Sequence, residues 1–337
     1  MKLPCYFHPD QLQFKPAYEW AFGNKIRHPE TTARAENILR ALKKNSVFDV
    51  QAPKSVPLGA IKRSHSYQLV TLYNAASRMP EGETFYPSVF PRGSLGRGDP
   101  TNIRHAGAFC FDSGTPLCNQ TWTAASWSAA CGYSAASAVL HGEPIAYALS
   151  RPPGHHATKE LFGGYSYFNN TAIAAKRLRA KGTVAVLDID FHHGNGTQAI
   201  FERDANVLTV SVHGDPREFY PFFSGYAGEQ GVGRGAGFNL NLPLPGGTDG
   251  DRFLEELDSH ALPAVANFAP DYLVVAAGFD TYERDPVGDF RLTTADYRRV
   301  GEAIGKLKLP TVVVQEGGYY APHLGRNVVS FLGGLAG

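Results

Sequence analysis

Two carboxylates and two imidazoles stand together in the stretch VAVLDIDFHHGNG, residues 184–196. Asp188, Asp190, His192 and His193 follow directly on an apolar run that is typical of a buried strand. Groups of like charge repel at this spacing, and burying them is costly unless another group compensates. The combination therefore indicates a divalent metal ion at the end of a strand.

Zinc is the metal that these residue types favour. Alternation along an extended chain turns Asp190 and His192 to the same side, where they can take two corners of a zinc site. Asp280, which follows another apolar run, is the candidate third ligand. Three protein ligands leave one position open, as in catalytic rather than structural zinc sites. The competing interpretation is that Asp190 and His192 only pair with each other or cap the following helix.

The motif RPPGHHA, residues 151–157, adds a histidine pair suited to acid–base chemistry. The prolines stiffen the turn that presents His155 and His156, and unperturbed histidine titrates near neutral pH. Each ring needs an orienting partner, and Asp188 and Asn195 are the natural candidates. A carboxylate makes one histidine more basic than an amide makes the other, which separates their roles. The alternative is a pair of structural histidines.

The motif EGGYY, residues 316–320, places a tyrosine after the last apolar run. Tyr319 is the candidate donor of a hydrogen bond to a developing oxyanion. Tyr320 is the competing candidate, and a packed or surface tyrosine is the alternative to both. The sequence around the two residues does not separate them.

Short apolar runs must position these motifs. The runs at 145–149, 184–189, 207–212, 272–277 and 311–315 are typical of strands buried on both faces, and helical patterns lie at 121–140, 169–181 and 250–268. This alternation predicts an α/β fold with a mostly parallel sheet, in which functional groups gather at the carboxyl ends of strands. Gly142 and Gly182 are expected as helix C-caps.

We expect one domain over residues 1–337, interrupted by a long loop at about 80–118 that is rich in proline and glycine. The formal net charge of +1 argues against a nucleic-acid binder. Four cysteines without CxxC spacing are expected to be reduced, in a cytoplasmic protein. The N-terminal residues lack a signal-peptide pattern, and no apolar run reaches membrane-spanning length, so no membrane association is expected.

Taken together, RPPGHHA, LFGGYSYFNNTAIAA, LDIDFHHGNGTQAIF, FDTYERDP and EGGYYAP resemble the zinc-dependent deacetylase superfamily that includes the histone deacetylases. The likeness is strongest to its bacterial acetylpolyamine amidohydrolase branch. It implies the arginase–deacetylase fold, an open parallel sheet of about eight strands flanked by helices. It also implies one zinc ion on Asp190, His192 and Asp280, and hydrolysis of an N-acetyl or other small N-acyl amide.

The resemblance assigns roles to the remaining motif residues. His156 is the general base and acid, oriented by Asn195, and His155 is an electrostatic partner held by Asp188. Tyr319 joins zinc in polarising the amide carbonyl. The resemblance further implies two potassium sites. The first set is Asp188, Asp190, His192, Ser211 and Val212, and the second is Phe201, Asp204, Val207 and Phe238.

Substrate choice is expected to depend on a tunnel and its mouth. The resemblance places Gly164, Tyr165 and Tyr220 along the tunnel, and the 80–118 loop at its mouth and across a homodimer. The two acids that attract a polyamine in this branch fall at Arg104 and Gly114. Arginine near a polycation costs affinity, although Asp112 is placed to compensate. Polyamines are therefore in doubt as substrates.

Three different interpretations stay open. In the first, the substrate is an acetyl-lysine side chain of a protein, or another small N-acyl compound, rather than an acetylpolyamine. In the second, the chain is an arginase-type two-metal ureohydrolase, which shares the architecture but needs a further carboxylate where this chain has Tyr282. An inactive acyl-group binder is the third, non-enzymatic interpretation.

Overall fold

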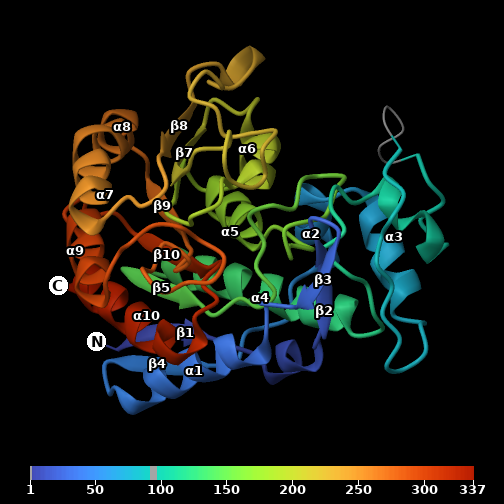
Figure 1. Ribbon diagram of the computed structural model, residues 1–337. Coiled ribbons are helices and arrows are strands. Elements are labelled where there is room, and N and C mark those ends of the chain that lie inside the picture. Colours follow the sequence, from blue (N-terminus) through green and yellow to red (C-terminus); the bar gives the residue numbers. More distant parts are fainter. Residues whose placement is uncertain (1, 92–96) are drawn as a thin grey trace.

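An eight-stranded parallel sheet forms the centre of the molecule (Figure 1). The computed structural model describes residues 2–91 and 97–337. In spatial order the strands are β4 (Phe48–Gln51), β1 (Leu3–Tyr6), β5 (Ile145–Ala148), β10 (Thr311–Gln315), β9 (Tyr272–Ala277), β6 (Val184–Asp188), β7 (Val207–Gly214) and β8 (Asn239–Leu244). Every pairing between these neighbours is parallel. The predicted fold class is confirmed.

Helices cover both faces of the sheet. They are α1 (Thr32–Lys44), α2 (Leu58–Ser64), α3 (Tyr67–Ala76), α4 (Thr121–Leu140), α5 (Asn170–Arg179), α6 (Asn195–Phe201), α7 (Gly250–Glu256), α8 (Leu262–Phe268), α9 (Thr294–Gly305) and α10 (Ala321–Ala336). Figure 1 shows α8, α7, α9, α10 and α1 following one another along one side of the molecule, with α2 and α3 on the opposite side.

Alternation along the central strands explains the two layers. Leu187, Val275 and Val313 pack in one core with residues of α1, α9 and α10. Val186 and Val274, one position away, pack in a second core with α4 and α5. Successive side chains of a strand point to opposite faces, so a strand that is apolar throughout needs a cover on each.

The order of the strands brings the motifs together. β5, β10, β9 and β6 are consecutive neighbours in the sheet and parallel. Their carboxyl ends therefore lie at one edge, which is where ligands bind in open parallel sheets. The segments that follow these four strands contain RPPGHHA, EGGYY, FDTYERD and DIDFHHG respectively.

Two details differ from the expectations. The predicted helix at 250–268 is interrupted by a π-helical turn, η4 (Leu257–Ala261), next to Pro263 at the start of α8. Proline has no N–H to donate within a helix, and the wider turn accommodates it. Gly182 is not a helix C-cap, because α5 ends at Arg179. A Cβ at Gly182 would lie 2.4 Å from a carboxylate oxygen of Asp271, so close packing explains that glycine.

The segment 80–118 is partly ordered by its neighbours. Residues 92–96, including Arg92, lie outside the described residues. Phe85 and Leu117 form an isolated antiparallel bridge, and η2 (Ile103–Ala108) is a 3-10 helix. Phe109 and Leu117 are buried in a third core with α2 and α3. The segment is thus anchored at its two ends.

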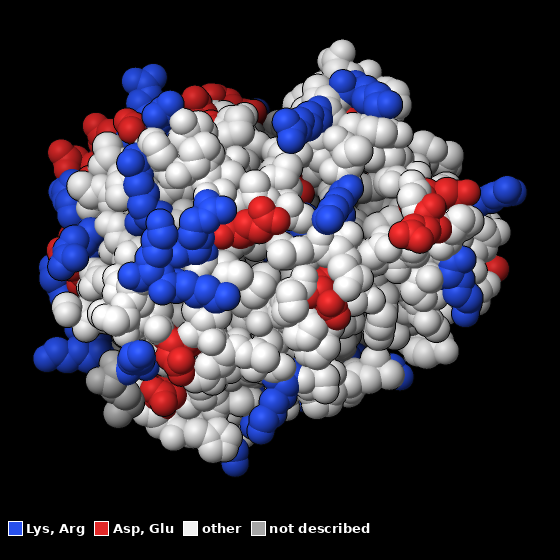
Figure 2. Space-filling view, turned by 90° about the horizontal axis from the view of Figure 1, so that it is seen from below, with Lys and Arg blue, Asp and Glu red and all other residues white. Residues whose placement is uncertain are grey.

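The remaining elements lie at the periphery. They are the 3-10 helices η1 (Pro9–Gln13) and η3 (Gly233–Gly235) and the two-stranded hairpin of β2 (Tyr18–Ala21) and β3 (Asn24–Arg27). On the face in Figure 2, basic side chains gather in one cluster that adjoins acidic side chains, and broad uncharged areas surround the charged groups. Among the described helices, none has the length and apolar character needed to span a membrane.

Candidate metal centre and histidine pair

Asp190, His192 and Asp280 form a buried cluster of metal-ligating groups. One ligand atom from each lies within 4.8 Å of the others. The Nδ1 atom of His192 is 3.0 Å from Oδ2 of Asp280 and 3.4 Å from Oδ1 of Asp190. Asp190 comes from the end of β6 and Asp280 from the end of β9, which are paired strands.

Two glycines make room for the carboxylates. A Cβ at Gly278 would lie 1.9 Å from Oδ2 of Asp190, and a Cβ at Gly317 would lie 2.3 Å from Oδ2 of Asp280. Backbone groups then fix the acids, because the Gly317 N–H donates to Asp190 at 2.8 Å and the Phe191 N–H donates to Asp280 at 2.9 Å. No larger residue fits at either glycine without displacing a carboxylate.

The electrostatics of the cluster favour a cation. Burial and the nearby Asp190 charge raise the pKa of Asp280 to about 7. Burial alone would raise the pKa of Asp190, but His155 and the hydrogen bonds with His192 lower it. A dication relieves the repulsion between two buried carboxylates. Two buried carboxylates and one buried imidazole are a donor set that fits zinc, and an ion held by these three residues would have a position open for substrate or water.

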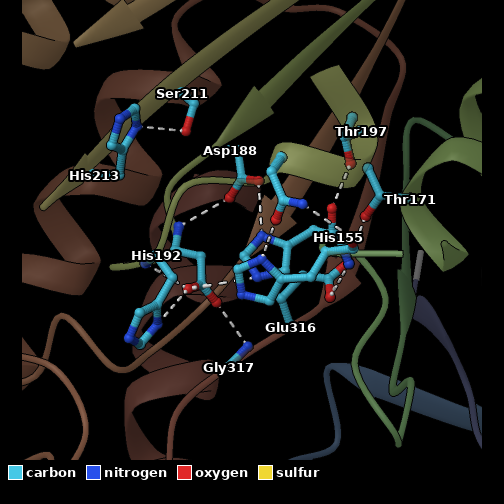
Figure 3. A network of polar contacts seen from close by, with 12 residues as sticks. His155, Thr171, Asp188, His192, Thr197, Ser211, His213, Glu316 and Gly317 are labelled. Atoms are coloured by element: carbon cyan, nitrogen blue, oxygen red, sulfur yellow. Dashed lines mark hydrogen bonds and ion pairs between the residues drawn. The ribbon is translucent and has the colours of Figure 1, made fainter. Parts of the chain in front are cut away.

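The histidine pair lies beside this cluster, and each ring has its own partner. His155 Nδ1 is 3.0 Å from Oδ2 of Asp188 (Figure 3), and His156 Nδ1 is 2.7 Å from Oδ1 of Asn195. The two rings are 4.0 Å apart, and the ring of His156 is 6.1 Å from that of His192. The structure thus brings both histidines together with the partners expected from the sequence.

The different partners separate the charge states of the two rings. Burial would lower the pKa of His155, but Asp190 and Asp188 raise it to about 10. Burial and the positive charges of His155 and His192 lower the pKa of His156 well below its usual value. An amide oxygen only accepts, so Nδ1 of His156 carries its proton and Nε2 is free to take another.

The structure separates the two tyrosines of EGGYY. The ring of Tyr319 lies 5.8 Å from that of Tyr165 and under the Arg34 guanidinium at 4.7 Å. Burial raises the pKa of Tyr319 well above its usual value. The ring of Tyr320 instead packs beside His323 and under Arg284. Asp285 accepts the N–H groups of both tyrosines, which fixes the backbone there.

The expected tunnel residues gather around Asp112. This carboxylate accepts the Gly164 N–H at 2.5 Å, the Tyr220 hydroxyl at 2.9 Å and the Gly114 N–H at 3.0 Å. Gly164 has a φ of 57° and lies against His156, where a Cβ would be 2.2 Å from the ring. The Tyr220 ring packs on His156 at 5.0 Å. Asp112 therefore joins the two segments, around Gly164 and Tyr220, that contact His156.

The two positions where the family places its acids have different surroundings here. Arg104 is exposed on η2, which packs against α3. A Cβ at Gly114 would lie 2.9 Å from Oε2 of Glu19, a buried side chain of β2. Burial raises the pKa of Glu19 to about 7, opposed by a hydrogen bond with Tyr165. A carboxylate from the β2–β3 hairpin thus occupies the space beside position 114.

The potassium candidates fall into two groups in the structure. Asp188 and Ser211 are paired neighbours on β6 and β7, and the Ser211 hydroxyl is 2.8 Å from Nδ1 of His213. Val212 follows on β7. In the second group, the Asp204 N–H donates to the Phe201 carbonyl and the Val207 N–H to the Asp204 carbonyl. The Phe238 carbonyl accepts from Thr209. Each group lies around one end of β7.

Sequence reasoning missed several charged residues near the site. Glu316 is fully buried, and its carboxylate bonds to the loop that carries the histidines. Arg34 bonds to the carbonyls of Glu316 and Gly318 and pairs with Glu30. A charged residue directly after a buried strand was a usable signal for Glu316. Glu19 and Arg34 lie in amphipathic segments, where charge is typical of a solvated face.

Comparison with known proteins supports one family. A model of the histone deacetylase domain matches residues 28–335. An acetylpolyamine amidohydrolase of Burkholderia pseudomallei is 42% identical over 98% of both chains, and one of Mycoplana ramosa is 40% identical over 94% of this chain and 95% of its own. The crystal structure of an acetylpolyamine aminohydrolase from Burkholderia pseudomallei matches with a TM-score of 0.93 at 41% identity, covering 99% of each chain.

Proposed function

Since this chain belongs to the histone deacetylase family and is a deacetylase, we propose that it removes the acetyl group from a small acetylated amine with zinc held by Asp190, His192 and Asp280. The observation that carries this proposal is the meeting of four strand ends. The buried ligand triad and the two differently partnered histidines support it, as does a tyrosine that follows β10. This is the set that amide hydrolysis requires.

Each group has a defined task in the proposed reaction. A bound zinc ion supplies Lewis-acid polarisation and a water molecule of lowered pKa. His156 takes a proton at Nε2 from the attacking water and returns one to the leaving amine. His155 stays protonated beside Asp188 and stabilises negative charge in the site. The Tyr319 hydroxyl donates a hydrogen bond to the amide oxygen as its charge develops.

The substrate amine we propose is one with a second, cationic nitrogen, as in acetylpolyamines. Three relatives from Burkholderia pseudomallei and Pseudomonas aeruginosa that are 41–42% identical to this chain are acetylpolyamine amidohydrolases. Arg104 is exposed on η2, whereas the carboxylates of Glu19 and Asp112 lie beside Tyr165 and Tyr220. These acids make that wall favourable for a cation. A protein acetyl-lysine or a neutral amide is the alternative substrate.

A two-metal ureohydrolase and an inactive binder have less support. Tyr282, at the position where the ureohydrolase needs a carboxylate, has its hydroxyl 2.7 Å from Nδ1 of His323. Those two residues lie with Tyr320 rather than with the ligand triad. A protein that only binds an acyl group would not need two histidines with different charge states. It is tested by turnover alone.

We further propose a cytoplasmic homodimer formed through the 80–118 loop, with potassium at the two sets of residues around β7. Exposed Val89 and Phe90 on the loop support an interface. The four free cysteines fit a reducing compartment. We propose no nucleic-acid or membrane partner, in keeping with the mixed surface charge.

Acetate release from a panel of substrates tests the proposal. The panel contains acetylputrescine, acetylcadaverine, an acetyl-lysine peptide and a neutral N-acetyl amine, each assayed with the zinc-loaded enzyme and with its Asp280→Asn variant. Preference for the two diamines supports the proposed substrate class. Preference for the peptide or the neutral amide overturns the substrate class but not the chemistry, whereas zinc-loaded protein without turnover on any amide overturns the proposed reaction.

A further inference from the structure

Glu316 is a buried carboxylate that the proposed reaction does not use. It follows β10 directly, and its side chain has no exposed surface. One oxygen, Oε2, accepts the N–H groups of Gly154 at 2.6 Å and His155 at 3.0 Å. The second oxygen, Oε1, accepts the hydroxyl of Thr171 at 2.7 Å (Figure 3). Both oxygens of the carboxylate are therefore engaged.

These bonds join three elements that are far apart in the sequence. Gly154 and His155 belong to the turn at 151–157 that carries the histidine pair, and Thr171 lies in the first turn of α5. Glu316 itself is fixed at the end of the sheet, because its N–H donates to the Ala277 carbonyl at 2.9 Å. The side chain thus pins the histidine turn to the edge of β10.

The next residue fixes a metal ligand from the same strand end. The Gly317 N–H donates to Oδ2 of Asp190 at 2.8 Å. Residues 316–317 therefore hold the histidine turn with a side chain and a zinc ligand with a backbone group. The distance between the general base and the ligand triad depends on this short segment.

A carboxylate suits this position better than a neutral side chain. Two adjacent N–H groups and one O–H group all donate, and an ionised carboxylate only accepts. The positive end of the α5 dipole, close to Thr171, also favours negative charge. Burial raises the pKa of Glu316 to about 7, and the positive charge of His155 and the bond from Gly154 oppose that effect.

We propose that Glu316 is a positioning residue whose carboxylate holds the histidine turn in register with the metal ligands. Glu316 acts on catalysis through His155 and His156, and it contacts neither the substrate nor the ion. This inference rests on the proposed roles of the histidine pair. Displacing a catalytic group by about 1 Å is expected to cost roughly 100-fold in rate.

The test compares Glu316→Ala and Glu316→Gln with wild type. For Glu316→Ala we expect kcat to fall by about 100-fold while KM stays within about threefold, because substrate binding is left intact. Zinc content, measured by elemental analysis, stays at the wild-type level. Glu316→Gln keeps an acceptor oxygen for the turn and regains about tenfold of the lost kcat. Glu302→Gln on exposed α9 is the matched surface control.

A second measurement reads the position of the turn directly. Hydrogen exchange of the peptide covering 151–157 accelerates by about tenfold in Glu316→Ala, because two protected N–H groups lose their acceptor. Thr171→Val, which keeps both of those bonds, leaves this exchange and kcat within about threefold of wild type. If Glu316→Ala does not fold, Glu316→Asp takes its place, since its shorter side chain withdraws the oxygens from the turn.

Four results overturn the inference. They are a kcat within about threefold of wild type in the Ala or Asp variant, zinc loss in that variant, an equal loss in Glu316→Gln, and unchanged exchange at 151–157. The His156→Ala variant distinguishes failure of the inference about Glu316 from failure of the proposed function. If His156→Ala is active, the proposed function fails. If it is inactive while Glu316→Ala is active, only the role of Glu316 fails.

Discussion

The edge of the sheet and the loops around it differ in burial and in hydrogen bonding. At the edge, Asp190, His155 and His156 are buried, and each has at least one fixed hydrogen-bond partner. Around it, the hairpin of β2 and β3 and the 80–118 loop expose Phe22 and Val89, at 90% and 74%. The buried edge tolerates few side chains, whereas the loops can vary. We therefore expect the chemistry to depend on the sheet edge and the choice of substrate to depend on the loops.

Loss of a candidate metal ligand is expected to have the largest effect on activity at the sheet edge. Asp280→Asn is expected to lower acetate release by at least about 1,000-fold and to lower zinc content. Thermal unfolding is a second readout, because a bound ion stabilises the folded state. Chelation lowers the Tm of wild type but not that of Asp280→Asn. A variant that still binds zinc and turns over substrate contradicts the ligand assignment.

The histidine pair gives the next largest effect. His156→Ala is expected to lower kcat by roughly 1,000-fold with zinc still bound, because the group that moves the proton is lost. Acetate release and metal analysis on the same sample measure this. Asn195→Ala, which removes only the partner of His156, serves as the graded comparison, and its loss must be smaller.

Tyr319→Phe is expected to lower kcat by about 100-fold, since one hydrogen bond to the developing oxyanion is removed. Tyr320→Phe is the matched control and stays within about twofold of wild type. Steady-state kinetics on both variants decide between the neighbouring tyrosines. Equal losses, or a larger loss in Tyr320→Phe, reverse the assignment that the packing supports.

The hairpin carboxylate predicts a pH effect on stability. Folding raises the pKa of Glu19 from 4.5 to about 7. Between these values the folded state binds more protons than the unfolded state, so this residue makes wild type less stable as pH rises. Relative to Glu19→Gln, wild type is expected to lose about 3 kcal/mol of unfolding free energy between pH 4.5 and pH 8. Denaturant unfolding of both proteins across this range measures it, and parallel curves contradict it.

The smallest effect is expected on the outer surface. Arg104 is exposed, and solvent and salt screen its charge. Arg104→Glu is therefore expected to change the ratio of kcat/KM between acetylputrescine and a neutral N-acetyl amine by less than about threefold. A change in this ratio above about tenfold would place Arg104 at the substrate. The outer part of the loop would then take part in substrate binding, contrary to the contrast drawn between loop and sheet edge.

The strands and motifs of the buried edge were predictable from the sequence, whereas the contacts of the supporting residues Glu316 and Arg34 and of the loops were not. Apolar runs mark the five strands β5, β6, β7, β9 and β10, and the functional motifs follow four of them. β1, β4 and β8 are short or only partly buried and have no such run. The contact of Glu19 with position 114 joins segments that are far apart in the sequence. No local pattern encodes that contact, since it depends on how the hairpin packs on the loop.

The position of β10 in the sheet affects how the enzyme is made. β10 is the last strand in the sequence, yet it lies between β5 and β9 near the centre. During synthesis the segments with β5 and β6 leave the ribosome long before residues 311–319, and until then β5 and β9 lack the strand that pairs with both of them. The bonds from Glu316 to the histidine turn and from Gly317 to Asp190, together with Tyr319, are added only when this strand is inserted. A nascent chain that ends before β10 therefore contains the candidate ligand triad without these bonds, and we expect activity to appear only after β10 has been made.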